Sequence, residues 1–244
     1  EVARSCSNLK AIVNITTDKC YENDNRTYGY QEDDPMGGHD PYSASKGCAE
    51  LAASSYHLSF LQEQDIGLAS VRAGNVIGGG DWANDRLIPD ILRSFEKNKS
   101  VVIRNPKATR PWQHVLEPLS GYLVLAQKLF KDQNKYSGGW NFGPNEQDVR
   151  PVDWILDKMI LKWPNSSWVL DKDSNPYESN FLKLNITKAK SKLEWSPVWG
   201  LDYTLEGIID WHKAWLNKED MQAICLAKIE KYMLDMVKKR HLLK

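Results

Sequence analysis

Ala11-Ile-Val-Asn-Ile-Thr-Thr17-Asp18-Lys19 is an apolar run that ends in consecutive polar side chains. Such a run, short and rich in β-branched residues, predicts a buried strand whose carboxyl end lies near Thr17. A turn-rich passage follows, and Pro41-Tyr42-Ser-Ala-Ser-Lys46 then opens a predicted helix. Strands continue to alternate with helices along the chain, which indicates an α/β fold.

Tyr42 and Lys46 are four residues apart, so they share one face of the predicted helix. Lys46 can then hold a cofactor ribose while its ammonium favours the phenolate form of Tyr42, an arrangement that suits acid–base work near neutral pH. A Tyr-x-x-x-Lys pair alone is common by chance, and Thr-Asp at a strand end is often only a turn. In this order, on a strand and then a helix, they resemble the proton-handling set of the short-chain dehydrogenase/reductases, which implies redox chemistry on a sugar or alcohol.

Composition excludes several other classes of protein. The 244 residues suffice for one large domain or two small ones, and 32 basic residues balance 32 acidic ones, so no net charge favours nucleic acid. No apolar run is long enough for a membrane span, and no leader is recognisable. Four cysteines and five histidines show no metal-ligand spacing, which predicts no metal site and reduced thiols in a cytoplasmic protein.

A doubly wound dinucleotide fold grips the pyrophosphate at its first strand–helix turn. No G-x-G-x-x-G occurs after a strand, and Gly74-Asn-Val-Ile-Gly-Gly-Gly-Asp81 lacks the Lys-Ser/Thr of a phosphate loop. We therefore expect the chain to be the C-terminal part of a Rossmann-type doubly wound parallel sheet. Residues 1–75 are predicted to form the second half of the dinucleotide-binding domain, its first half being absent. Residues 76–244 are predicted to form mostly a smaller mixed α/β substrate lobe, with interleaved Rossmann elements.

Hydrophobic periodicity and turn residues predict the remaining elements. Strands are expected at 67–76, 100–104, 138–144, 167–171 and 181–185. Helices are expected at 42–64, 114–131, 151–163, 188–194, 204–216 and 221–239, with a short helix around 88–92.

Long motifs are spread over most of the chain, from about residue 11 to residue 221. They are Thr17-Asp18-Lys19, Tyr42-x-x-x-Lys46, Asp33-Asp-Pro-Met-Gly-Gly, Val71-Arg-Ala-Gly-Asn-Val-Ile-Gly-Gly-Gly-Asp-Trp82, Asp85-Arg-Leu-Ile-Pro-Asp90, Arg110-Pro-Trp-Gln-His-Val-Leu-Glu-Pro-Leu-Ser-Gly-Tyr122 and Gly139-Trp-Asn-Phe-Gly-Pro-Asn145. Together they resemble the CDP-glucose 4,6-dehydratases, which are extended short-chain dehydrogenase/reductases. The long motifs are specific to that subgroup, whereas Tyr-x-x-x-Lys marks only the superfamily.

The resemblance implies a redox-neutral conversion of CDP-glucose to CDP-4-keto-6-deoxyglucose with tightly held NAD, as in deoxysugar and O-antigen biosynthesis. Tyr42 would take the C4 hydroxyl proton while Thr17 binds the C4 oxygen. Asp18, if protonated, would donate to the leaving C6 oxygen, and Lys19, if neutral, would remove the C5 proton. Ile15 and Gly74, at strand ends, would hold the ribose and nicotinamide together with Tyr42 and Lys46. Without the first half, we expect the chain alone to bind NAD weakly and to be inactive.

Substrate contacts follow from charge and from the resemblance. A pyrophosphate favours arginine forks and amide donors. Asn75, Arg86 and Arg110 stand where relatives place such groups, Arg104 is a further candidate, and Asn145 is a candidate for the nucleotide end. Any single arginine can instead form an ordinary surface ion pair.

Other readings remain open. An epimerase needs no C6 acid, and such relatives usually carry Ser or Ala where Asp18 stands. Inverting dehydratases of UDP-N-acetylglucosamine usually lack the tyrosine found here at position 42. The chain could also be an inactive fragment that binds a sugar nucleotide, and nothing in the sequence distinguishes cytosine from uracil.

Relatives dimerise through the helix that carries Tyr-x-x-x-Lys. Residues 42–64 have more than one apolar face, which predicts a homodimer through this helix. The apolar residues are Ala49, Leu51, Ala52, Ala53, Tyr56 and Phe60.

Overall fold

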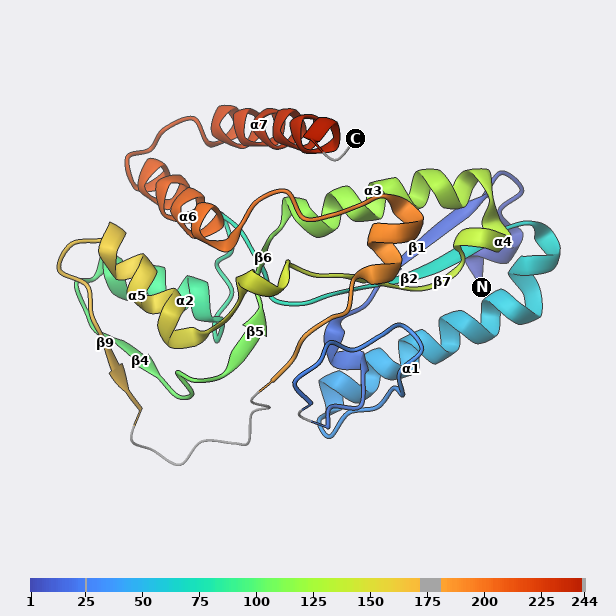
Figure 1. The fold of residues 1–244 in the computed structure, drawn as a ribbon, viewed down its shortest axis with the longest axis horizontal. Helices are drawn as coiled ribbons and strands as arrows, with labels where there is room; N and C mark the ends of the chain where they lie inside the picture. The colour runs from blue at the N-terminus through green and yellow to red at the C-terminus, as the bar shows by residue number, and fades with distance from the viewer. Residues whose placement is uncertain (25, 172–180, 243–244) are drawn as a thin grey trace. The chain divides into compact units, whose positions relative to one another are not determined.

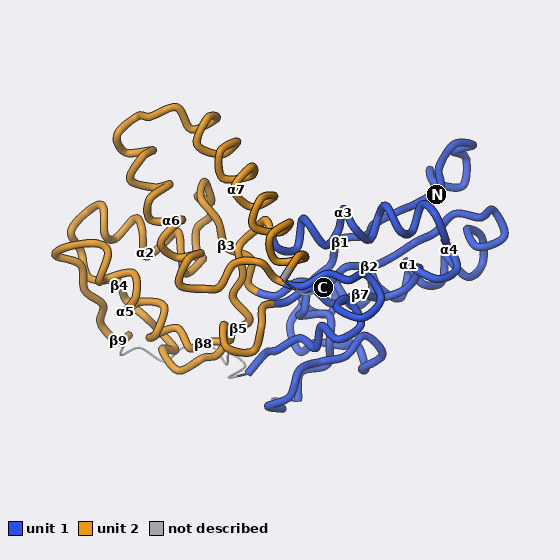
Figure 2. The backbone as a smooth tube through the Cα atoms, turned by 45° about the horizontal axis from the view of Figure 1, so that its top comes forward, with its two compact units in different colours: residues 1–74, 117–143, 181–196 blue, residues 75–116, 144–180, 197–244 orange. Residues whose placement is uncertain are grey.

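The computed structural model describes residues 1–24, 26–171 and 181–242, and its fold is drawn in Figure 1. The chain divides into two compact units, shown in different colours in Figure 2. Unit 1 consists of residues 1–74, 117–143 and 181–196, and unit 2 of residues 75–116, 144–180 and 197–244. The first change of unit follows Gly74, but unit 1 also includes two later segments of the chain.

Unit 1 is built on a parallel sheet of β1 (Ala11–Ile15), β2 (Gly67–Ala73) and β7 (Gly138–Phe142), in the order β1-β2-β7. Every residue of the central strand β2 is buried, which explains its nearly continuous apolar sequence. Helices α1 (Pro41–Tyr56) and α3 (Leu116–Lys131) lie along the sheet (Figure 1). The predicted α/β class is confirmed by this alternation of parallel strands and helices.

The two faces of β2 contact different helices because side chains alternate along a strand. Ala69 and Val71 pack with Leu125 and Leu129 of α3, in the larger core of unit 1. Leu68, on the other face, packs in a smaller cluster that includes Ala53 of α1. Even-numbered residues of β2 therefore face α1.

Local capping starts α1 where the sequence predicts it. The Asp40 carboxylate accepts a hydrogen bond from the Ser43 amide at 3.0 Å, and Pro41 occupies the first turn. After Tyr56 the chain continues as a π-helical turn, His57–Leu61, and a 3₁₀ turn, Gln62–Gln64. The expected helical span of 42–64 is thus observed, with changes of helix type in its last turns.

Unit 2 combines three short strand pairs with helices. Strands β3 (Val76–Ile77) and β6 (Gln113–His114) are parallel, as are β4 (Val101–Ile103) and β9 (Trp168–Leu170), whereas β5 (Thr109–Pro111) and β8 (Val149–Pro151) are antiparallel. The helices are α2 (Leu87–Glu96), α5 (Val152–Lys162), α6 (Leu201–Leu216) and α7 (Met221–Leu242), and the first three enclose an apolar core. Unit 1 also holds the short helix α4 (Gln133–Tyr136). Within the described residues, no helix combines the length and apolar character needed to cross a bilayer.

Three expected elements differ from the structure. The strand expected at 67–76 is divided into β2 and β3, which belong to different sheets. Residues 181–185 form an isolated bridge, Tyr30 with Leu184, rather than a strand. The Tyr30 amide donates to the Lys183 carbonyl at 2.9 Å and the Asn185 amide to the Tyr30 carbonyl at 2.8 Å, so the segment pairs with a loop. The helix expected at 188–194 is a π-helical turn, Ala189–Leu193.

His114 of β6 makes the stability of unit 2 depend on pH. Its Nδ1 accepts a hydrogen bond from the Leu116 amide at 3.1 Å, and its side chain is 3% exposed. Burial, and then the Lys228 ammonium, lower the pKa of His114 from 6.5 to about 4. As pH falls from 6.5 to 4 the unfolded state binds the proton first, so stability is lost across that window, by about 3 kcal/mol.

Between pH 7 and pH 4, we expect the free energy of unfolding to fall more in wild type than in His114→Asn. The asparagine Oδ1 can accept the same hydrogen bond, but the asparagine side chain does not titrate. Urea unfolding at several pH values measures the difference. His39→Asn, at an exposed position, is the control and should follow wild type. Equal pH dependence of wild type and His114→Asn would contradict the role of this group.

Candidate active site

The carboxyl ends of β1, β2 and β7 lie at one edge of the sheet because the strands are parallel. Ile15 pairs with Val71 at this edge, and Ala73 pairs with Phe142. Ile15 is 58% exposed there, and Gly74 follows β2 directly. The sheet therefore brings the turn after β1 and the end of β2 to the same edge, where open-sheet folds bind their ligands.

The turn after β1 places a hydroxyl beside a carboxyl group. Asp18–Cys20 form a 3₁₀ turn, and Thr17 caps it by accepting a hydrogen bond from the Lys19 amide at 3.4 Å. The Thr17 hydroxyl donates to Asp18 Oδ1 at 3.1 Å. Both side chains are buried, with 9% and 4% exposed. A buried carboxyl group held by a hydroxyl is suited to exchange a proton with a ligand at this edge.

The Tyr42 ring joins this turn to α1. Lys19 Nζ, from the turn, and Lys46 Nζ, from α1, each lie 5.9 Å from the centre of that ring. Tyr42 is 51% exposed, so its phenol can meet a ligand. The structure thus brings Lys19, from the turn, close to Tyr42 of α1, so predicted catalytic residues of two separate segments meet within unit 1.

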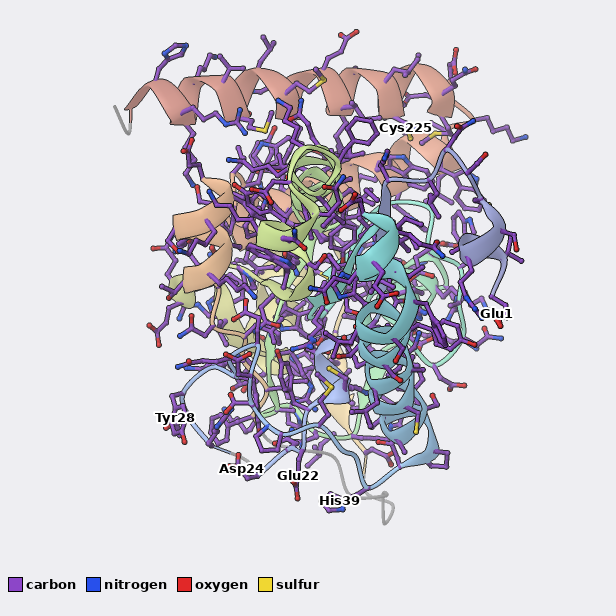
Figure 3. All side chains as sticks on the ribbon, turned by 90° about the vertical axis from the view of Figure 1, so that its right-hand side faces the viewer. Glu1, Glu22, Asp24, Tyr28, His39 and Cys225 are labelled. Atoms are coloured by element: carbon purple, nitrogen blue, oxygen red, sulfur yellow. The ribbon has the colours of Figure 1, made fainter. Side chains whose placement is uncertain are left out.

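The loop between the turn and α1 is tied back to both. The Gly37 amide donates to the Cys20 carbonyl at 2.9 Å, and Tyr21 pairs with Met36 in a β-bridge. Glu22, Asp24, Tyr28 and His39, labelled in Figure 3, are exposed on this loop. The loop's backbone therefore supports the turn, while several of its charged side chains point to solvent.

Five predicted substrate residues belong to unit 2. The Asn75 carbonyl accepts from the Gln113 amide at 3.0 Å. Arg86 precedes α2, is 65% exposed and pairs with Asp81 at 3.3 Å. Arg104 is exposed after β4, and Asn145 precedes the 3₁₀ turn Glu146–Asp148.

The fifth predicted substrate residue, Arg110, lies next to a charged residue that the sequence did not indicate. On the antiparallel pair β5–β8, Arg110 lies directly opposite Arg150. Like charges in such positions repel, so a bound anion would stabilise them. Arg150 lies outside the motifs described above, and only the strand pairing places it opposite Arg110. We add Arg150 to the candidate anion contacts.

Two further residues of unit 1, Glu50 and Arg72, were not predicted from the sequence. Both are charged and buried, with 4% and 3% of their side chains exposed. An arginine inside a strand that otherwise reads as fully buried was an available signal, because buried charges need partners. Tyr122 of α3 has its pKa raised by burial and then by the Asp18 charge.

Residues 1–139 match the NAD dependent epimerase/dehydratase family. The chain belongs to this family. A CDP-glucose 4,6-dehydratase of Salmonella typhimurium is 56% identical over 239 residues, covering 96% of this chain and 67% of the relative. The resemblance predicted from the motifs is therefore confirmed, and the chain spans about two thirds of that relative's length.

Solved structures show the same fold at low identity. The dTDP-glucose 4,6-dehydratase of Bacillus anthracis, in complex with NAD, has a TM-score of 0.69 and 20% identity, with 82% of this chain and 61% of that chain covered. A UDP-glucuronic acid 4-epimerase mutant of Bacillus cereus has a TM-score of 0.74 and 20% identity, with 87% and 65% covered.

The family confirms NAD as the cofactor that the motifs predict. Several observations in unit 1 fit its ribose and nicotinamide end. Tyr42 and Lys46 lie on one face of α1, and Ile15 and Gly74 lie at the strand ends. The assignment of these four residues to NAD stays a prediction.

Proposed function

We propose that the protein containing this chain is a CDP-glucose 4,6-dehydratase, a hydro-lyase that forms CDP-4-keto-6-deoxyglucose. The observation that supports the proposal is that Lys19, from the turn that holds the buried Thr17–Asp18 pair, and Lys46, from α1, both lie 5.9 Å from the centre of the Tyr42 ring. The 56% identity to the Salmonella enzyme supports CDP-glucose as the substrate.

The residues of unit 1 divide the acid–base work. Tyr42 accepts the C4 hydroxyl proton, and the Thr17 hydroxyl binds the C4 oxygen. NAD, when bound, supplies the hydride acceptor for C4 and later the hydride donor for C6. Asp18 protonates the departing C6 oxygen, because hydroxide leaves poorly without a proton. Lys19 removes the C5 proton that the C4 ketone acidifies, and a proton returns to C5 when C6 receives the hydride.

Unit 2 binds the nucleotide in this proposal. Arg110 and Arg150 concentrate positive charge on β5–β8 and bind the pyrophosphate. Arg86 and Arg104 are exposed and are further proposed contacts of the nucleotide, and Asn75 and Asn145 are proposed to supply amide groups. Arg86 would exchange its ion pair with Asp81 for the substrate.

A side-by-side assay of CDP-, UDP-, dTDP- and GDP-glucose tests the proposal. The intact gene product should convert CDP-glucose to a 4-keto-6-deoxy sugar, followed by the alkaline absorbance of the ketone. The other three nucleotide sugars should react more slowly, since the 56% identical relative acts on CDP-glucose by name. Equal turnover of all four, or none of CDP-glucose, would rule the proposal out. Isomerisation without water loss would favour the epimerase alternative.

We also propose a cytoplasmic homodimer that packs through α1. Leu51 and Leu58 of this helical span are 64% and 66% exposed, which supports a partner on that face. The four free cysteines support a reducing compartment. Light scattering checks the dimer, and a particle of monomer mass at high concentration would contradict it.

A further inference from the structure

A buried ion pair connects α1 with the central strand of unit 1. Glu50 Oε1 accepts from Arg72 Nε at 2.9 Å, and Glu50 Oε2 accepts from Arg72 Nη2 at 2.9 Å. This bidentate geometry fixes both the distance and the orientation of the two groups. Arg72 is an even-numbered residue of β2 and therefore extends toward α1, as its contact with Glu50 shows.

The pair also holds both ends of the turn that carries Thr17 and Asp18. Before the turn, the Thr16 hydroxyl donates to Glu50 Oε1 at 2.5 Å. After it, Arg72 Nη1 donates to the Tyr21 hydroxyl at 2.7 Å. The residues that flank the turn are thus bound to the same two charged groups.

On α1, the pair is aligned with the proposed catalytic residues. Tyr42, Lys46 and Glu50 follow one another at intervals of four and lie on one side of the helix. Holding Glu50 fixes the rotation of α1 and its position along the sheet. It thereby fixes where Tyr42 and Lys46 stand relative to the turn.

Charge and space both favour this arrangement. Burial raises the pKa of Glu50, but the hydrogen bond and charge of Arg72 outweigh it, so the Glu50 pKa lies below its usual value. A Cβ added at Gly139 of β7 would lie 2.6 Å from Arg72 Nη2, so a glycine is needed there to make room for the guanidinium. The ion pair therefore occupies a space that β7 leaves open for it.

We propose that Glu50 and Arg72 are positioning residues, which set Tyr42 and Lys46 against Thr17 and Asp18. The inference rests on the proposed function for its kinetic consequences. Without the ion pair, α1 and the turn would keep their own secondary structure, but their relative position would be less well defined. A misplacement of about 1 Å can reduce a rate about 10²-fold.

Two variants of the intact gene product disturb the pair in different ways. Glu50→Gln keeps the side-chain shape and removes the charge, whereas Gly139→Ala keeps both charges and presses on the guanidinium. We expect kcat to fall about 10²-fold in Glu50→Gln and about 10-fold in Gly139→Ala, with KM for CDP-glucose within about 3-fold of wild type. The control is Leu125→Ala, which opens a cavity in the core of unit 1 and lowers stability without changing the ion pair.

Amide hydrogen exchange gives a readout that does not require activity. Exchange should accelerate at residues 16–21 and in the first turns of α1 in both variants, and not in Leu125→Ala. If wild type fails to turn over CDP-glucose while this pattern appears, the proposed function is wrong and the positioning role stands. The positioning role is overturned if both variants have the same kcat as Leu125→Ala and the same rates of amide hydrogen exchange at residues 16–21. If Glu50→Gln does not fold, Gly139→Ala decides by the same two measurements.

Discussion

Tyr42→Phe should abolish oxidation at C4, with a loss of turnover of about 10²–10⁴-fold, because the only group placed to accept the hydroxyl proton in the proposal is gone. The phenyl ring preserves the shape of the side chain, so its neighbours Lys19 and Lys46 keep their places beside it. Binding of CDP-glucose should change little. Single-turnover reduction of bound NAD measures the C4 step directly.

The matched control is Tyr56→Phe, which removes a hydroxyl from the last turn of the same helix. Tyr56 packs edge-on against Phe60, and phenylalanine can keep that contact. It should retain wild-type turnover. Rapid reduction of NAD in Tyr42→Phe would assign the C4 base to another residue.

Asp18→Asn should leave oxidation at C4 largely intact and block the loss of water, again by about 10²–10⁴-fold. The asparagine Oδ1 can still accept the Thr17 hydrogen bond, so the turn should keep its geometry. It has no proton suited to transfer to the leaving C6 oxygen. A 4-keto-glucose intermediate or reduced cofactor should therefore accumulate, detectable by mass spectrometry and by absorbance.

Asp65→Asn serves as the control for this substitution. Asp65 is an exposed residue with a φ of 54°, a left-handed conformation that asparagine also adopts readily. Its turnover should equal that of wild type. Full activity of Asp18→Asn, with no intermediate, would place the C6 acid elsewhere.

Local chemistry explains what the sequence predicted correctly. The β-branched run before Thr17 forms β1, and Asp40 with Pro41 caps the start of α1. The four-residue interval between Tyr42 and Lys46 sets their shared helix face before any tertiary contact forms. These features depend on neighbours within a few residues, so they can be read from the sequence.

Only the tertiary structure decided which distant segments meet. Residues 181–185 alternate like a strand, yet they pair with the loop at Tyr30. Glu50 forms its ion pair with Arg72, which is 22 positions away in the sequence, and Arg110 lies opposite Arg150 in an antiparallel strand pair. Sequence patterns record which face of an element is apolar, but the partner of a buried charge depends on strand order and register. The sequence therefore indicated the residues that we propose for the acid–base work, whereas the ion pair that we propose positions them emerged only from the fold.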